Sequence, residues 1–282
     1  MKRKILAIVL ITAITLSNCS SDNNQSNTID ENIKYLKSDK SDNMIYPGDY
    51  DKFFEYENGF LTKTSTGNTN INNEIYTYDS YGKIISKQNY FGYYTYIYDN
   101  QNRLIKEVQN GTNNYINLTY GANKVSLTKY YEYPGGSFTE NFELTLDNSG
   151  RIIKHKRLTP TADETSMVDE YLYDNNGNIS EVRFKENNYG NADKIVYYQY
   201  DNKPNPYFYS LKKINNSIYY LKCIDGLNNY EFSGFTPNNM TVYGSTTYSY
   251  TYDELGYPKT QLITYYNGSG GTTTTGHTFE YY

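Results

Sequence analysis

One short phrase, (Tyr/Leu)-Asp-x-x-(Gly/Asn), recurs along the chain and limits its fold more than any other feature. Aspartate at the first position of a type I turn accepts hydrogen bonds from backbone N–H groups ahead of it. Glycine at the fourth position supplies a positive φ, and asparagine is the residue that best replaces it there. Such turns, with a G1 bulge, close antiparallel hairpins. The expected turn residues are Asp79 and Gly82, Asp99 and Asn102, Asp147 and Gly150, Asp174 and Gly177, and Asp253 and Gly256.

The same phrase could open a calcium loop, since it offers Asp and Asn oxygens beside a glycine. An EF-type loop also needs a bidentate Glu at its twelfth position. The twelfth residue from Asp174 is Lys185, and the twelfth from Asp99 is Asn110. The phrase therefore predicts turns and no metal site. Shorter or altered copies begin at Tyr56, Tyr120 and Tyr200.

The segments between the turns alternate as strands do. In Thr247–Tyr252 three tyrosines share one face and Thr, Ser and Thr share the other. The chain has 37 Tyr, 11 Phe and no Trp, so tyrosine is expected to build the buried surface, packing its ring while its hydroxyl finds a partner. The alternative is an aromatic platform for a ligand such as a sugar. Cross-strand packing is the commoner cause of such ladders.

The turn aspartates drift in spacing from 20 to 27 residues, which favours one continuous meander over separate domains. About 230 residues would give on the order of 16 to 18 strands. A sheet of that length must coil, close or be covered. We predict an all-β fold: a long antiparallel meander of repeated hairpins that forms a curled, partly barrel-like open sheet. Turns or edges are expected at Pro204, Pro206, Pro237 and Pro258, and a loop at residues 267–276.

The N-terminus has the form of a bacterial export signal. Lys2, Arg3 and Lys4 precede an apolar run from Ile5 to Leu16, which is too short to span a bilayer as a helix. The run ends at Leu-Ser-Asn-Cys19, which resembles a lipobox. The predicted organisation is a signal peptide at 1–18, a lipidated Cys19 with a flexible tether to residue 48, and one β domain at 49–282. A plain secretory signal is the alternative.

Charge and cysteine content restrict the partners. Removal of residues 1–18 leaves 23 basic and 31 acidic residues, a net charge of −8. That balance disfavours binding to nucleic acid and electrostatic docking on anionic lipid, so the expected membrane contact is the lipid at Cys19. If Cys19 carries lipid, Cys223 has no disulfide partner within the chain and is read as a small apolar strand residue.

The phrase resembles the YD repeats of RHS-type proteins, whose hairpins form long curved sheets. Together with the lipobox, the chain is similar to a Bacteroidota-type lipoprotein family of unknown function with RHS-like repeats and a proposed porin-like fold. Three late stretches carry this resemblance: Tyr200 to Pro206, Pro237 to Asn239, and Tyr252 to Pro258. The resemblance covers roughly residues 50–282. It implies a fold and an outer-membrane location and no activity.

Few residues suit catalysis. The only histidines are His277 and His155, which lies in the basic run Lys154–Arg157 and is expected on a solvated strand face. Two histidines and one free cysteine do not make the usual zinc or iron sites. No phosphate-binding or dinucleotide fingerprint is present. Carboxylate pairs stay open, at Asp163-Glu164 and Asp169-Glu170. No catalytic residue, cofactor or metal is predicted.

Three hypotheses on function follow. The first is a lipid-anchored, non-enzymatic envelope protein whose tyrosine-rich sheet serves as a scaffold or binding surface for a glycan or an envelope protein. The second is a membrane-embedded, porin-like barrel, which would require an outward apolar band. The third is a hydrolase built on a carboxylate pair. The sequence favours the first and leaves open which face of the outer membrane the protein occupies.

Overall fold

The computed structural model describes residues 33–42, 51–67, 73–158, 168–185, 194–224, 234–266 and 270–282, and these contain 18 strands and one helix. The first nine strands are β1 (Leu36–Ser41), β2 (Lys52–Glu57), β3 (Phe60–Thr66), β4 (Glu74–Tyr78), β5 (Ile84–Asn89), β6 (Gly92–Tyr98), β7 (Leu104–Gln109), β8 (Tyr115–Tyr120) and β9 (Lys124–Tyr133). The others are β10 (Gly136–Leu146), β11 (Ile152–Leu158), β12 (Val168–Tyr173), β13 (Ile179–Lys185), β14 (Lys194–Pro204), β15 (Asn238–Tyr243), β16 (Thr246–Tyr252), β17 (Pro258–Tyr266) and β18 (Thr272–Tyr281). Helix α1 spans Pro206–Lys222, between β14 and β15.

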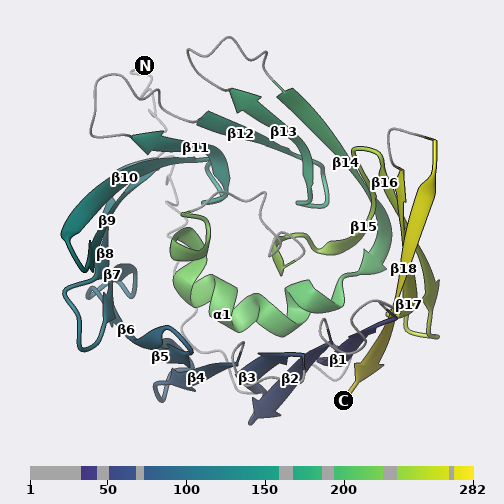
Figure 1. Ribbon diagram of the computed structural model, residues 1–282, viewed down its shortest axis with the longest axis horizontal. Helices are drawn as coiled ribbons and strands as arrows, with labels where there is room; N and C mark the ends of the chain where they lie inside the picture. Colours follow the sequence, from purple (N-terminus) through teal and green to yellow (C-terminus); the bar gives the residue numbers. More distant parts are fainter. Residues whose placement is uncertain are drawn as a thin grey trace, which may run out of the picture.

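The strands form one closed barrel in which every neighbouring pair is antiparallel (Figure 1). Strand β1 closes the ring, because Ser38 pairs with Phe53 on β2 while Lys40 pairs with Thr278 on β18. The predicted all-β meander of hairpins is confirmed. We expected a curled, partly barrel-like open sheet, and the described sheet closes completely. Strand β1 pairs with both β2 and β18, so no unpaired edge remains at the seam.

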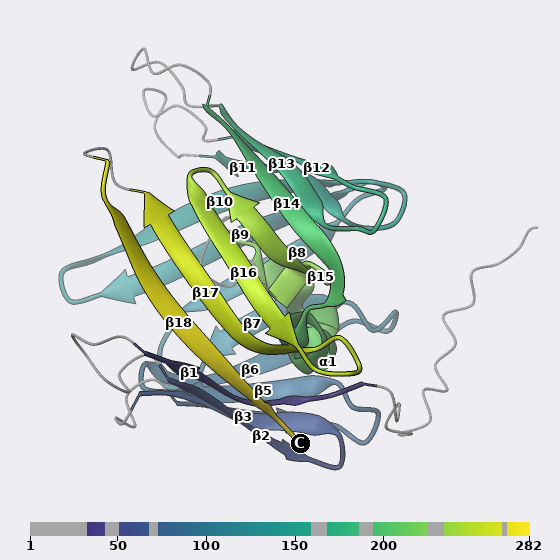
Figure 2. The ribbon, with the colours of Figure 1, turned by 90° about the vertical axis from the view of Figure 1, so that its right-hand side faces the viewer.

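The Tyr-Asp turns, defined as the five turns that begin at Asp79, Asp99, Asp147, Asp174 and Asp253, all lie at one end of the barrel, on the right in Figure 2. In each turn the aspartate Oδ1 accepts from the N–H groups two and four residues ahead, at 2.8–3.0 Å. The fourth residue has a positive φ, from 64° at Asn102 to 86° at Gly177. The register shifts beside each turn, as a bulge requires.

Tyrosine hydroxyls tie each hairpin to the one before it. In six hairpins a tyrosine near the end of one strand donates a hydrogen bond to a backbone carbonyl of the hairpin before it, at 2.7–2.8 Å. The acceptor is the apolar residue that follows the turn of that earlier hairpin. The donors and acceptors are Tyr78 and Leu61, Tyr98 and Ile84, Tyr120 and Leu104, Tyr173 and Ile152, Tyr200 and Ile179, and Tyr281 and Pro258. The phrase therefore codes for a turn and for a link between successive turns.

Strand β1 lies inside the segment that the sequence assigned to the tether. Its residues are mostly polar, and the inward Asp39 has partners from elsewhere in the fold: His277 Nδ1 at 2.7 Å and the Tyr207 hydroxyl. A polar strand forms here because closing the barrel satisfies its backbone on both sides. The signal peptide at 1–18 and Cys19 lie outside the described residues.

Helix α1 is the element that the sequence analysis missed. Asn205 caps it, accepting from the Tyr207 N–H at 3.0 Å, and Pro206 occupies the first turn, where its missing N–H costs nothing. The helix kinks at Ile218 and ends at Lys222, with Cys223 as its C-cap. The expectation that Cys223 is a strand residue is therefore wrong, although its side chain is buried.

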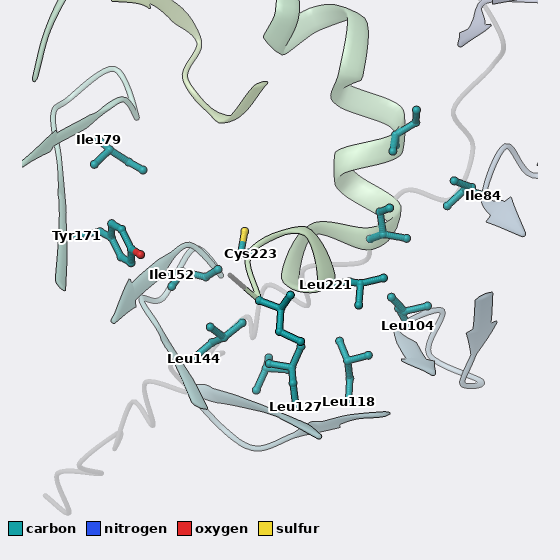
Figure 3. Close-up of a cluster of buried hydrophobic side chains, with 14 of the residues drawn as sticks. Ile84, Leu104, Leu118, Leu127, Leu144, Ile152, Tyr171, Ile179, Leu221 and Cys223 are labelled. Carbon is teal, nitrogen blue, oxygen red and sulfur yellow. The ribbon is translucent and has the colours of Figure 1, made fainter. Parts of the chain in front are cut away.

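The helix runs through the interior of the barrel (Figure 1) and contacts β1, β3 and β5. Its buried Ile214, Ile218 and Leu221 belong to the same apolar cluster as the inward side chains of the surrounding strands (Figure 3). The cluster lies toward the Tyr-Asp turns, because it contains the residues that follow them, such as Ile84 and Ile152. An 18-stranded ring is too wide to be filled by strand side chains alone. Helix α1 supplies the missing volume.

Prolines lie at element ends, as expected: Pro204 ends β14, Pro206 begins α1 and Pro258 begins β17. Part of the predicted loop at 267–276 is wrong, because Thr272 to Gly276 belong to β18 and pair with β17. Residues 267–269 lie outside the described residues.

Candidate functional site

The charged side chains of β4 to β7 include several that point into the barrel. Residues opposite each other on antiparallel strands share a face. Tyr76, 3% exposed and interior, is opposite Lys87, and Tyr96, 4% exposed and interior, is opposite Glu107. Lys87 and Glu107 therefore face inward too.

The same pattern continues across β9 to β11. Lys129 is opposite Glu140, two residues along the strand from the buried Phe142, and Arg157 is opposite Phe142 itself. Ion pairs link these groups: Lys129 Nζ lies 3.6 Å from Glu140 Oε2, and Arg157 also contacts Glu140. We name the set Glu74, Lys87, Glu107, Lys129, Glu140 and Arg157 the charged interior wall.

The charged interior wall lies toward the end of the barrel opposite the Tyr-Asp turns, and several of its side chains are partly exposed to water. The inward side chains of Lys87 and Lys129 remain 22% and 28% exposed, and that of Arg157 43%. Toward the Tyr-Asp turns the inward side chains are apolar, and α1 packs on them. The described barrel thus has an open end and a closed end, and its interior forms a cup.

Two carboxylates of the wall titrate differently. Burial raises the pKa of Glu107, and the Lys87 ammonium offsets only part of the effect. Burial also opposes ionisation of Glu74. Two partners outweigh this effect and lower the pKa of Glu74: the Lys87 ammonium, with Nζ 3.5 Å from Glu74 Oε1, and the Tyr76 hydroxyl, which donates to the carboxylate. The wall therefore holds a proton on Glu107 to a higher pH than on Glu74.

A second polar group inside the barrel joins three elements. Asp39 on β1 accepts from His277 on β18 and from Tyr207 on α1, and the Lys52 ammonium lies 5.2 Å from the centre of the Tyr207 ring. Asp39 is only 4% exposed. Because each partner comes from a different element, the group fixes the seam of the barrel and the start of the helix.

The basic run Lys154–Arg157 lies on β11, and its predicted solvated face is only half right. Lys154 pairs outward with Glu170, whereas His155 is buried and bonds through Nε2 to the Ile224 carbonyl at 2.9 Å. Arg157 also points inward. The alternation of a strand sends successive side chains to opposite faces, and Ile224, just after the end of α1, offers a partner for the inward histidine.

The same alternation separates the candidate carboxylates. Asp169 faces inward opposite His155, while Glu170 faces outward and binds Lys185 Nζ at 2.9 Å. Adjacent acids on opposite faces of a sheet cannot act on one bond. Asp163 and Glu164 lie outside the described residues. In the part of the chain that the structure describes, no group of three His, Cys, Asp or Glu side chains is placed to hold a metal ion.

The rim of the open end carries a second feature that sequence reasoning missed. Strands β9 and β10 form a long hairpin that projects from this end (Figure 2), and the exposed rings of Tyr131, Tyr133 and Phe138 gather near its tip. The local signal is the alternation of Tyr131, Glu132 and Tyr133, which the sequence analysis did not single out. Among the described residues, no helix has the length and apolar character to cross a membrane.

Comparisons with solved structures find other proteins of similar chain course. A porin-like protein from Bacteroides vulgatus aligns over 88% of this chain and 99% of its own, with 14% identity and a TM-score of 0.38. A porin-like protein from Bacteroides uniformis aligns over 88% and 96%, with 12% identity and a TM-score of 0.33. The Tc holotoxin pore of Photorhabdus luminescens aligns over 80% of this chain and 15% of that one, with 11% identity and a TM-score of 0.30. The chain matches no protein-family model and no curated protein.

Proposed function

We propose that this protein is a lipid-anchored component of the outer membrane that acts without catalysis, as a scaffold or binding surface, and that it offers the open end of its barrel to a partner. The observation that carries the proposal is the asymmetry of the interior. One end is filled by α1 and apolar side chains, and the other holds a charged wall that water reaches. A cup of this kind suits capture better than conduction.

The path of the chain supports this orientation. Strand β1 begins at the closed end, where the Leu36 N–H donates to Ser210 Oγ on α1 and Tyr35 packs on Tyr56, 5.2 Å between ring centres. The segment from Cys19 thus joins the barrel at its closed end. A lipid at Cys19 holds that end toward the membrane and directs the open end away from it.

The outer face of the barrel argues against the membrane-embedded alternative. Glu170 faces outward in the middle of β12 with Lys154 and Lys185 beside it, and Glu55 pairs outward with Lys63 at 2.7 Å. A lysine or arginine on a lipid-facing strand costs about 2–4 kcal/mol near the bilayer centre, and an aspartate or glutamate costs less. A lipid-embedded barrel needs an outward apolar band, whereas this outer face carries charged pairs, so it suits a barrel surrounded by water.

Lipid attachment is tested in cells that express the full chain. Metabolic labelling with an alkyne analogue of palmitate is expected to mark the wild-type protein, and Cys19→Ala is expected to lose the label and accumulate as the uncut precursor. Cys223→Ala is the matched control and keeps the label. Equal labelling of wild type and Cys19→Ala would refute the anchor.

Orientation is tested by single-cysteine labelling on intact cells with a membrane-impermeant maleimide. Phe91→Cys lies at the open end, where Phe91 is 74% exposed, and Tyr81→Cys at the closed end, where Tyr81 is 89% exposed. The native Cys223 is 1% exposed and gives little background. In the purified protein, where only exposure matters, Tyr81→Cys should react with the maleimide faster than Phe91→Cys. On intact cells the proposed orientation predicts that Phe91→Cys reacts faster, because the closed end faces the membrane.

Protection of both cysteines until the outer membrane is permeabilised would place the barrel on the periplasmic side and favour the scaffold role. Faster labelling of Tyr81→Cys on intact cells would refute the orientation. Protease release of peptides from residues 50–282 gives an independent readout of the same question.

A further inference from the structure

A shallow cleft lies at the rim of the open end, between the β7–β8 loop and the tip of the β9–β10 hairpin. Its volume is about 560 Å³. It is lined by Gly111, Thr112, Asn113, Asn114, Glu132, Tyr133 and Pro134. Apart from the ring of Tyr133, the side chains in this lining are mostly amides, a hydroxyl and a carboxylate, which are groups that recognise a polar ligand.

Tyr133 also belongs to an aromatic surface on the inner face of the hairpin, whereas Glu132 points to the outer face. The cleft lies at the edge of β9 between these two faces, where β8 pairs with β9 only as far as Tyr130. The ring of Phe138 lies 5.4 Å from Tyr131 and 6.3 Å from Tyr133, centre to centre, and the three rings are 40–48% exposed. We name Tyr131, Tyr133 and Phe138 the rim triad. Its planes are tilted by 35° and 44°, so it offers successive faces at changing angles and not one flat row. Tilted faces suit a short, twisted chain and not a flat crystalline surface.

The polar part of the cleft is held in place by its own hydrogen bonds. Asn114 accepts from the Glu132 N–H at 2.7 Å, and Asn113 Nδ2 donates to Glu132 Oε2 at 2.6 Å. Thr112 Oγ1 donates to the Gln109 carbonyl at 2.8 Å. Glu132 Oε1 and Asn113 Oδ1 take part in none of the hydrogen bonds among the described residues, so they are oriented acceptors at the surface of the cleft.

Charge narrows the class of ligand. No lysine or arginine is among the described residues that line the cleft, and the nearby Lys129 is paired with Glu140. An anionic ligand such as a phosphate or a nucleic acid would meet Glu132 with no cation to balance its charge. A neutral ligand with many hydroxyl groups and apolar C–H faces fits both halves, since its hydroxyls donate to the acceptors and its faces stack on the rings.

We propose that the cleft and the rim triad bind a neutral oligosaccharide. The oligosaccharide crosses the edge of β9: sugar rings on the inner side stack on Tyr133 and Phe138, and hydroxyl groups of the sugars that lie in the cleft donate to Glu132 Oε1 and Asn113 Oδ1. The inference deepens the proposed function by naming the class of ligand, and its biological meaning rests on the open end facing away from the membrane.

Binding is measured by isothermal titration calorimetry on the mature, lipidated full chain in detergent micelles. The neutral probes are maltoheptaose, xylohexaose and mannohexaose, and the contrasting probes are a sulfated glycan and a decaproline peptide. We expect the protein to bind at least one neutral probe. Tyr133→Ala and Phe138→Ala should each raise its Kd roughly 2- to 12-fold, the loss of one ring contact of about 0.5–1.5 kcal/mol.

Tyr81→Ala is the control, because Tyr81 is an exposed tyrosine at the opposite end of the barrel and its replacement should leave the Kd unchanged. The exposed triad residues contribute little to the core, so the variants should keep the wild-type circular dichroism spectrum. The proposal is overturned if no neutral probe binds, if both triad variants bind as wild type does, or if only the sulfated glycan or decaproline depends on the triad. Such a failure in a protein that passes the lipid and orientation tests refutes the ligand class alone.

Discussion

The tyrosine ties between hairpins can be tested at Tyr98. Its hydroxyl donates to the Ile84 carbonyl at 2.7 Å, beside two register shifts where the regular ladder is interrupted. Burial raises the pKa of the Tyr98 phenol well above its ordinary value, so the group stays a donor throughout the working pH range. Tyr98→Phe keeps the ring and removes only the hydroxyl. A typical net contribution of one such hydrogen bond is about 0.5–1.5 kcal/mol.

The measurement is urea unfolding of the mature chain, followed by circular dichroism. Tyr98→Phe should lower the free energy of unfolding by about 1 kcal/mol without changing the slope. Tyr173→Phe, six strands away, removes the equivalent bond to Ile152, and the double variant should lose about 2 kcal/mol because distant sites add. Tyr81→Phe, on an exposed side chain, should change nothing. Unfolding of Tyr98→Phe at the wild-type midpoint would refute a stabilising role for the ties.

Three further predictions concern the turns, the helix and pH. Gly177→Ala should lower the free energy of unfolding by roughly 1–2 kcal/mol, because its φ of 86° is unfavourable for alanine although a Cβ there would meet nothing within 4 Å. Gly82→Ala should lower it more, because its Cβ would also lie 2.5 Å from the Phe60 ring. Both variants are measured by urea unfolding. Ile214→Ala should lower the free energy of unfolding by about 2–5 kcal/mol through a cavity between α1 and the strands, measured by the same urea titration. Burial opposes ionisation of Asp147, but backbone N–H groups and the neighbouring guanidinium outweigh it and lower its pKa. The unfolded chain therefore takes up this proton first as pH falls, so acid titration should show stability lost below about pH 4, and Asp147→Asn should flatten that loss.

The sequence predicted the repeated parts of the fold because their cause is local. A positive φ at the fourth turn position can be read from Gly or Asn alone. The tyrosine alternation in Thr247–Tyr252 is confirmed in the structure, where Tyr250 lies inward opposite Gln261. The turn conformation and the strand alternation each depend only on residues that are close together in the sequence.

The missed elements depend on distant partners. Strand β1 carries no apolar alternation, and its inward Asp39 is acceptable only because His277 and Tyr207 reach it across the barrel. Helix α1 did have a local signal, the Asn205-Pro206 start, which the repeat pattern overshadowed. The charged interior wall was beyond prediction, because Lys87 and Lys129 lie on strands far apart in the sequence and are brought to one interior only by the register of the sheet.

Closure by β1 also fixes when the barrel can be completed during synthesis. The pairs that seal it join residues more than 230 positions apart, such as Lys40 with Glu280 and Asp39 with His277. Hairpins can form one by one as the chain emerges, but β1 lacks one neighbour until β18 has been made. Contacts of such long range form slowly, and open strand edges invite aggregation meanwhile. A chain with this topology therefore depends on protection until its last strand arrives, and truncation within β18 should lower the yield of folded protein more than loss of any single tyrosine tie.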